Sequence, residues 1–288
     1  NIFLKMKKLN SIIITCYNRE EALEKCFNNL LKADQINNFN IVIVRQRGFD
    51  KVKALVKNFN FKNKYIIETD YLDDLNPNKK MAYNGYKGCD FAFSKLDPNY
   101  ICYLEDDIIV SKDFFNFHNF LHKKFLYDPN FFGVNGFSKE PYIFSKINLY
   151  SKFVYGLGKG YSFNSNIWNI IKEKIWNKEF FQQDVPYLDS PIENYIKKNN
   201  YFVIMPILSR IYEFPTEGTN ISLKNNLIYF KKFKESFVGE NHNKNEIYRY
   251  SFTQRYTWRS DCKKYLGSFL NQTRISLKKF IKLIYKFC

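Results

Sequence analysis

The chain has 288 residues, of which 45% are hydrophobic and 19% aromatic, which excludes a generally disordered polypeptide. A formal net charge of +17 points to an anionic partner: nucleic acid, an anionic membrane or a phosphorylated ligand. No apolar run reaches the ~18 residues that span a bilayer, and the start has no secretory signal pattern, so we expect a cytoplasmic protein. Three His exclude a Cys/His zinc cluster, and six Cys without a CxxC motif predict free buried thiols.

Apolar runs alternate with helical periodicity along the first hundred residues. This alternation predicts an α/β fold, with a mostly parallel sheet flanked by helices. Ligands bind at the carboxyl ends of such strands, so the loops after Thr15, Val44 and Leu104 should converge on one site. The predicted strands are 11–15, 40–44, 64–68 and 100–104, and the predicted helices are 20–32, 51–59 and 82–95.

Three carboxylates, Glu105, Asp106 and Asp107, follow the last of these strands directly. Adjacent carboxylates repel one another, so a cation is their natural compensation. Oxygen ligands suit Mg²⁺ or Mn²⁺, usually shared with substrate phosphates, and such an ion would neutralise a leaving diphosphate. The competing interpretation is a solvated acidic turn or a helix start near Asp113.

The acidic cluster lies in a segment that resembles a known family. Residues 103–115 (YLEDDIIVSKDFF) look like the EDD signature of the N-acetylglucosaminyltransferase I type, glycosyltransferase family 13, which has the Rossmann-like GT-A fold. Further segments are similar to the family in the same order, and the resemblance covers about residues 10–222. These segments are 127–136, Gly156-Leu157-Gly158, Leu188-Asp189 and Pro206 to Arg210.

The resemblance implies an inverting, metal-dependent transferase that uses a UDP-sugar, typically UDP-GlcNAc. A general base must deprotonate the acceptor, and Asp189 has the family position, with Asp184 and Glu193 as rivals. Asp189 also precedes Ser190-Pro191, a helix-start pattern, so the competing interpretation is a helix cap. The other implied roles are Asp107 as metal ligand, and Thr15, Arg19, Glu105, Asp106 and Gly158 as nucleotide-sugar-binding residues.

The sequence departs from the family pattern at several positions. The segment Val44 to Arg47 has an Arg where the family has an acidic residue that reads uracil. Asn18 replaces an Asp, and Leu188 replaces the aromatic residue before the base. Ser190 and Pro191 replace the second Asp and Trp of the acceptor-side motif. The donor base, the donor sugar and the acceptor can therefore all differ from those of the parent activity.

The composition changes near residue 223. Residues 223–288 contain 15 basic and 4 acidic residues, net +11, whereas residues 1–222 carry the remaining +6. At helical spacing, 273–288 has an apolar face and a lysine face, which suits an anionic membrane surface or a terminal helix on the protein's own core. We therefore predict a catalytic domain (1–222) and a basic, largely helical C-terminal extension (223–288). Residues 216–220 are a candidate lid or a plain turn.

The leading hypothesis is a glycosyltransferase that builds a bacterial-type surface polysaccharide or lipooligosaccharide. Its expected partners are a nucleotide-sugar donor, a glycan or lipid-linked acceptor, and the inner face of the membrane, where it would be peripheral. The alternative is a membrane-attached, non-catalytic binding module on a degenerate transferase fold. Retained clustered carboxylates favour the enzyme. Nucleic-acid binding is a third hypothesis, but no recognised motif supports it.

Overall fold

The computed structural model describes residues 8–70, 75–138, 148–154, 157–182, 189–213, 234, 237–240 and 248–250, without the side chain of residue 189. The chain divides into two compact units, residues 1–250 and 251–288. The second unit, with the amphipathic segment 273–288, lies outside the described residues, as do the candidate lid 216–220 and most of 223–250. The domain boundary at 222 stays a prediction.

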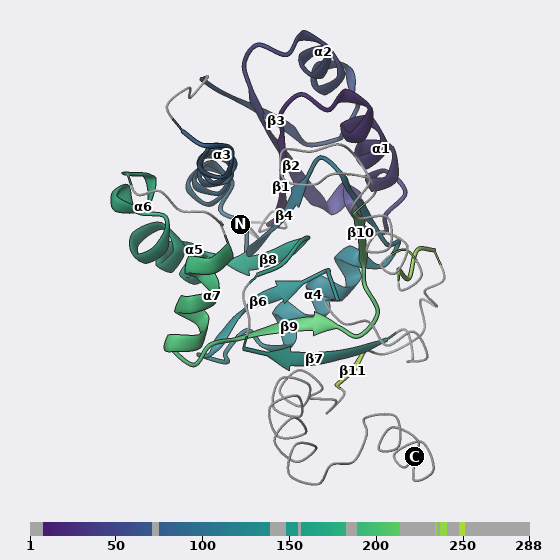
Figure 1. The fold of residues 1–288 in the computed structure, drawn as a ribbon. Coiled ribbons are helices and arrows are strands. Elements are labelled where there is room, and N and C mark those ends of the chain that lie inside the picture. The colour runs from purple at the N-terminus through teal and green to yellow at the C-terminus, as the bar shows by residue number, and fades with distance from the viewer. Residues whose placement is uncertain are drawn as a thin grey trace, which may run out of the picture. The chain divides into compact units, whose positions relative to one another are not determined.

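A nine-stranded sheet forms the centre of the first unit, in the order β11-β7-β9-β6-β8-β4-β1-β2-β3 (Figure 1). Strands β3, β2, β1 and β4 are parallel, whereas β8 is antiparallel to both of its neighbours. The bounds are β1 (Asn10–Cys16), β2 (Phe39–Gln46), β3 (Lys64–Thr69), β4 (Tyr100–Glu105), β6 (Phe131–Asn135), β7 (Leu149–Phe153), β8 (Tyr161–Asn164), β9 (Phe202–Pro206) and β11 (Arg249–Tyr250). A separate antiparallel pair joins β5 (Ile108–Val110) to β10 (Ile211–Glu213).

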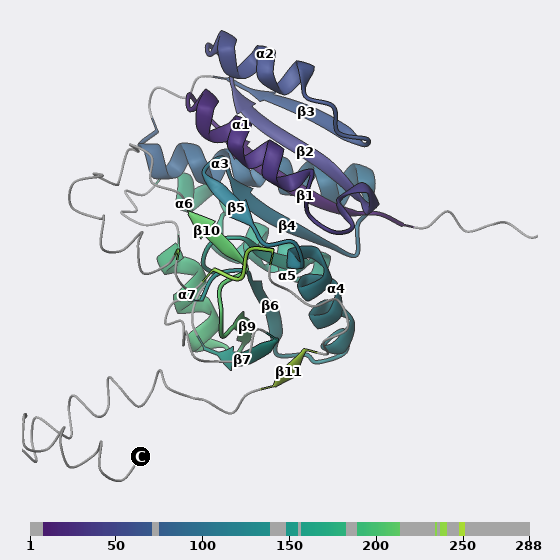
Figure 2. The same cartoon turned by 90° about the vertical axis from the view of Figure 1, so that its right-hand side faces the viewer.

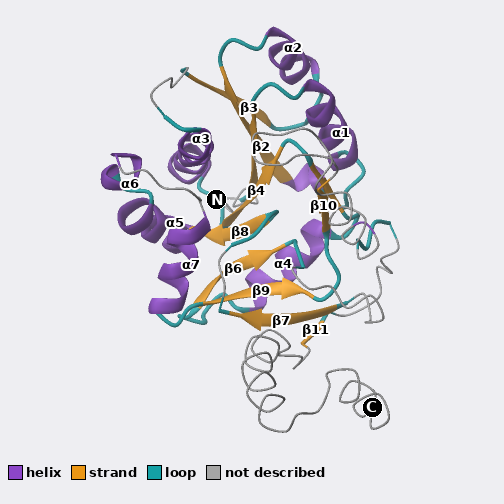
Figure 3. Cartoon of the chain, viewed as in Figure 1, coloured by secondary structure: helices purple, strands orange, loops and turns teal. Residues whose placement is uncertain are grey.

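Helices cover both faces of this sheet (Figures 2 and 3). Side chains alternate along β1, so Ile12 and Ile14 pack with α1 and α2 whereas Ile13 packs with α3, α5 and α7. The helices are α1 (Glu20–Leu30), α2 (Asp50–Asn58), α3 (Pro77–Phe91), α4 (Phe114–Lys124), α5 (Ser165–Ile170), α6 (Lys178–Gln182) and α7 (Asp189–Lys198), with short helical turns at Ile36–Asn38, Ala92–Leu96 and Ile171–Ile175. Of the helices described, none is long and apolar enough to cross a membrane.

The predicted fold class is confirmed, and the predicted strands lie within β1, β2, β3 and β4. The largest error is at the start of α3, predicted at residue 82 and observed at Pro77. Asn76 caps this helix, because its side chain accepts a hydrogen bond from the Lys79 backbone N–H at 2.9 Å. Pro77 then fits the first turn, where no backbone donor is needed. This Asn-Pro start signal lies outside the apolar periodicity on which the prediction depended.

Four of the six cysteines, Cys16, Cys26, Cys89 and Cys102, are buried and free, as predicted. Burial raises the pKa of the Cys102 thiol well above its usual value. Such thiols stay protonated and unreactive near neutral pH. The other two cysteines, Cys262 and Cys288, lie outside the described residues.

Two histidines of α4 share one hydroxyl group in the core. His118 Nδ1 and His122 Nε2 lie 2.6 and 2.7 Å from the Oγ atom of Ser162 on β8. Burial lowers the pKa of His122 to about 3, and burial together with His122 and Arg210 lowers the pKa of His118 well below its usual value. Both rings are therefore neutral in the folded protein at neutral pH.

We expect the folded protein to lose stability as the pH falls below about 6.5. In that range the unfolded chain binds protons at histidine and the folded chain does not, so acid favours unfolding until about pH 3. Each histidine should lower the free energy of unfolding by about 1.4 kcal/mol per pH unit in this range. Urea unfolding at pH 7.0 and 5.5 measures this slope. His122→Asn should show a smaller slope, and an unchanged slope in this variant would contradict the explanation.

Candidate active site

The carboxyl ends of β1, β2 and β4 lie side by side, as the sequence predicted. Thr15 is paired in register with Val44 on one side and with Glu105 on the other. Thr15 itself is buried, and its Oγ1 atom lies 3.0 Å from the hydroxyl oxygen of Tyr103. The strand ends therefore bring the loop after β1 next to the acidic cluster.

The acidic cluster forms the turn between β4 and β5. Glu105 ends β4 and is partly buried, whereas Asp106 and Asp107 are only 2% and 4% exposed. Arg19, the residue before α1, binds both aspartates: its guanidinium donates to Asp106 Oδ1 and, at 2.7 Å, to Asp107 Oδ2. The structure thus joins three predicted site residues through one ion-paired network.

Each of the two aspartates keeps one oxygen without a hydrogen-bond partner in the described part of the chain. These atoms are Asp106 Oδ2 and Asp107 Oδ1, and both are buried. Burial raises the pKa of Asp106 to about 6, although Arg19 opposes the shift. Leaving buried carboxylate oxygens unsatisfied is costly, and a divalent cation would satisfy them.

The described residues contain no group of three or more His, Cys, Asp or Glu side chains arranged as a complete metal cage. Mg²⁺ in enzymes is commonly held by one or two carboxylates, and its coordination is completed by water and substrate phosphates. The unpartnered oxygens of Asp106 and Asp107 therefore fit a cation that binds together with a phosphorylated ligand.

A second ion pair, which the sequence did not reveal, lies beside the cluster. Lys159 donates a hydrogen bond to Glu213 Oε1. Glu213 is paired in register with Ile108, the residue after Asp107. The sequence signal for Glu213 was a charged residue next to an apolar strand, but its partner Lys159 lies 54 positions away in the sequence. Among the described residues, the four carboxylates of Glu105, Asp106, Asp107 and Glu213 and the two cations of Arg19 and Lys159 have a formal net charge of two negative units.

The predicted donor-binding residue Gly158 lies in the same turn as Lys159. Its backbone N–H donates to Asn135 Oδ1 at 2.9 Å, so the turn is attached to the end of β6. The Gly136 N–H donates in turn to the Gly160 carbonyl at 2.7 Å. Gly158 therefore belongs to a fixed turn at the edge of the site.

The candidate bases are placed unequally. Asp189 begins α7, as the Ser190-Pro191 pattern predicted, but its side chain is not among those described. Asp184 lies outside the described residues. Glu193 binds Lys197 at 2.6 Å, one helical turn further on. This partner gives Glu193 a role in the helix itself, and the choice between Asp189 and Asp184 stays a prediction.

The basic residues that replace the family's acidic position at the end of β2 are held by carboxylates. Arg45 is buried and forms an ion pair with Glu68 of β3. Arg47 is exposed and lies 3.1 Å from Asp70. This loop therefore presents arginines that are neutralised by neighbouring acidic residues.

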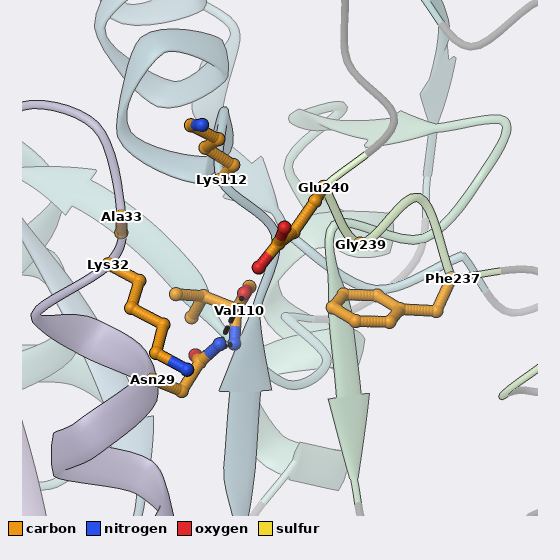
Figure 4. A pocket seen from close by; sticks show the side chains of 8 residues that line it. All are labelled: Asn29, Lys32, Ala33, Val110, Lys112, Phe237, Gly239 and Glu240. Atoms are coloured by element: carbon orange, nitrogen blue, oxygen red, sulfur yellow. Dashed lines mark hydrogen bonds between the residues drawn. The ribbon is translucent and has the colours of Figure 1, made fainter.

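A cavity of about 160 Å³ lies at the far end of β5 from Asp107 (Figure 4). Asn29 fixes one wall, because its side chain bonds the backbone N–H and C=O of Val110 at 2.7 and 3.1 Å. The Glu240 carboxylate points into the cavity. The lining contains none of the predicted site residues, so this cavity is separate from the acidic cluster. Its lining residues are Asn29, Lys32, Ala33, Val110, Lys112, Phe237, Gly239 and Glu240.

A mostly parallel sheet with an acidic turn at its carboxyl edge is the arrangement in which α/β folds bind nucleotides. Residues 3–256 match the GNT-I family, and the chain therefore belongs to this family. The GT-A fold expected from the resemblance is its fold. No individual curated protein matches the sequence.

Solved structures show more distant likenesses. Residues 1–349 of TarS from S. aureus share 13% identity with a TM-score of 0.46, covering 71% of this chain and 60% of that one. The mannosyltransferase PcManGT from Pyrobaculum calidifontis, solved with GDP-Man and Mn²⁺, shares 15% identity with a TM-score of 0.46, covering 68% and 54%. A second structure of S. aureus TarS shares 14% identity with a TM-score of 0.49, covering 80% of this chain and 44% of that one. The chain spans about half the length of these proteins, and likenesses at this level do not identify a substrate.

Proposed function

We propose that the protein is a metal-dependent, inverting glycosyltransferase that moves a sugar from a nucleoside-diphosphate donor to a glycan acceptor. The observation that carries this proposal is a pair of buried oxygens on Asp106 and Asp107, at the carboxyl edge of the sheet, that have no hydrogen-bond partner among the described residues. Family membership supports a UDP-linked, GlcNAc-like sugar as the donor.

In this proposal Asp107 is the metal ligand, with Mn²⁺ or Mg²⁺ as the ion. The bound ion would supply positive charge to the leaving diphosphate. Arg19 orients both aspartates through its two ion pairs. Glu105 and Asp106 contact the ribose and sugar of the donor, while Thr15 and Gly158 lie along the edge where the donor binds.

Transfer with inversion needs attack from the face opposite the leaving group. The acceptor hydroxyl oxygen forms a bond to the anomeric carbon, and its proton passes to the carboxylate of Asp189. The bond between the anomeric carbon and the diphosphate oxygen breaks at the same time, and its electron pair leaves with the nucleoside diphosphate. The support for this role is the match of Leu188-Asp189 to the family's acceptor-side motif.

A screen of nucleoside diphosphates tests the proposal directly. We would measure thermal unfolding of the full chain with Mn²⁺ and UDP, GDP, CDP or dTDP, and hydrolysis of the matching sugar nucleotides. Stabilisation by one diphosphate together with sugar release is the expected result. Binding without any sugar release or transfer would support a non-catalytic binding module. Stabilisation by none of the four would contradict the proposed donor.

The acceptor is proposed to be a lipid-linked glycan of surface polysaccharide or lipooligosaccharide synthesis, reached from the inner face of the membrane. The support is the charge of residues 223–288, which carry +11 of the total +17. Lysines on one face of an amphipathic helix bind anionic headgroups while the apolar face inserts between the lipids.

Deletion of residues 273–288 should therefore reduce binding to vesicles that contain anionic lipid. About 1 kcal/mol is expected for each basic residue near the surface, so the loss should be large at low salt. Co-sedimentation with anionic and with neutral vesicles measures it. Equal sedimentation of the full and shortened chains would show that this segment has another role.

A further inference from the structure

The ion pair between Lys159 and Glu213 lies beside the acidic cluster. Glu213 is 6% exposed, and its Oε2 atom has no hydrogen-bond partner among the described residues. Burial alone would lower the pKa of Lys159, but the carboxylates of Glu105, Glu213 and Asp107 outweigh it and raise the pKa above its usual value. The ammonium group is therefore charged and lies within the field of the acidic cluster.

The backbone that carries Lys159 is held tightly. Gly160 has a positive φ of 59°, and a Cβ atom there would lie 2.7 Å from Ile211 Cγ2. Ile211 belongs to β10, the strand that ends in Glu213. The strand that supplies the carboxylate therefore also packs against the turn that supplies the lysine, which fixes the two charges relative to each other.

The two cations of the site differ in what they can still bind. The Arg19 guanidinium already donates to both aspartates. An ammonium has three donors, one of the Lys159 donors goes to Glu213, and 27% of the lysine side chain is exposed. Lys159 is thus a charged donor with access to solvent beside the cation-binding oxygens.

We propose that Lys159, positioned by Glu213, binds the diphosphate of the donor and stabilises it as it leaves. This inference rests on the proposed function. Among the described residues and leaving Lys159 out of the count, four carboxylates and Arg19 carry three net negative charges, and a divalent cation neutralises only two of them, so an incoming diphosphate needs a further cation with spare donors. Lys159 meets this need. A part of the diphosphate affinity should therefore persist when the metal is removed.

The test compares wild type with Lys159→Gln in calorimetric titrations with UDP and uridine, each in Mn²⁺ and in EDTA. If another nucleoside diphosphate stabilises the wild type in the screen above, that compound and its nucleoside are used. We expect Lys159→Gln to bind UDP about tenfold to a hundredfold more weakly in both conditions, the range for a lost charge-assisted hydrogen bond. Uridine affinity should not change, because uridine has no phosphate. Lys159→Arg should recover most of the loss.

Two further variants separate phosphate binding from structure. Lys172→Gln removes a lysine from a different ion pair, with Asp90, and should leave UDP binding unchanged. Glu213→Gln should weaken UDP binding less than Lys159→Gln, because Glu105 and Asp107 still attract the lysine. Thermal unfolding without ligand shows whether each variant is folded.

The outcomes are distinct. Unchanged UDP affinity in folded Lys159→Gln would overturn the role of Lys159 and leave the proposed function intact. Equal weakening of UDP and uridine would also overturn it, since that result indicates a merely structural effect. A wild type that binds no nucleoside diphosphate would overturn both the proposed function and this inference.

Discussion

Asp107→Asn is expected to remove the metal-dependent part of donor binding and to lower transfer about a hundredfold to a thousandfold. The substitution keeps the shape of the side chain but removes its charge, and Asp107 Oδ1 is buried without a hydrogen-bond partner in the part of the chain that the structure describes. Metal-ion stabilisation of a leaving group is worth several kcal/mol, and each 1.36 kcal/mol corresponds to about tenfold in rate. Arg19 keeps Asp106 as a partner, so the loop after β1 should stay in place.

Titration of UDP at increasing Mn²⁺ concentration separates this effect from unfolding. Asp128→Asn is a matched control, because Asp128 forms an ion pair with Lys152 at 3.6 Å outside the site. Asp189→Asn should have the complementary behaviour, with donor binding retained and transfer lost. If Asp107→Asn binds UDP with the wild-type dependence on Mn²⁺, then Asp107 is not the metal ligand.

The position of the acidic cluster could be predicted because it depends on local sequence and one topological rule. Apolar runs identify buried strands, and the carboxyl ends of neighbouring parallel strands meet at one edge. The observed pairing of Thr15 with Val44 and Glu105 follows from that rule. No knowledge of side-chain packing was needed to place Glu105, Asp106 and Asp107 next to the loop after β1.

The contacts within the site could not be predicted in the same way. Arg19 bonds two aspartates 87 and 88 positions away, and Lys159 reaches Glu213 across 54 positions. The second contact depends on the antiparallel register of β5 with β10 and on a glycine turn packed against Ile211. Single-sequence patterns carry periodicity but not these pairings. The sequence around Lys159, which lies between two glycines, therefore gave no indication of its partner.

Arg210, the last residue of the family-like segment from Pro206, has a structural role. Arg210 and Asp113 are completely buried, with Arg210 Nε lying 3.3 Å from Asp113 Oδ2. Ser111 and Tyr248 donate to the same carboxylate at 2.7 and 2.9 Å. The guanidinium also stacks 4.9 Å from the centre of the Phe117 ring. This cluster joins the start of α4, the residue before β10 and residues 248–250.

Arg210→Met should destabilise the protein by about 3–5 kcal/mol, because it leaves the Asp113 carboxylate buried without its cation. For a domain of this size, that corresponds to a melting temperature lower by about 6–20 °C. Tyr248→Phe removes only one donor to Asp113 and should cost about 1–3 kcal/mol. Urea unfolding of the three proteins gives the comparison.

The double variant Asp113→Leu with Arg210→Met distinguishes the burial of an unpaired charge from a simple loss of packing. Removing both charges takes away the desolvation penalty, so the double variant should be more stable than Arg210→Met alone. Two results would show that the ion pair does not stabilise this cluster. One is that the losses of stability from the two substitutions simply add in the double variant. The other is that Arg210→Met lowers the free energy of unfolding no more than Tyr248→Phe does. In the expected case, Arg210 stabilises the fold by neutralising Asp113, a carboxylate that lies only six residues after the proposed metal ligand Asp107.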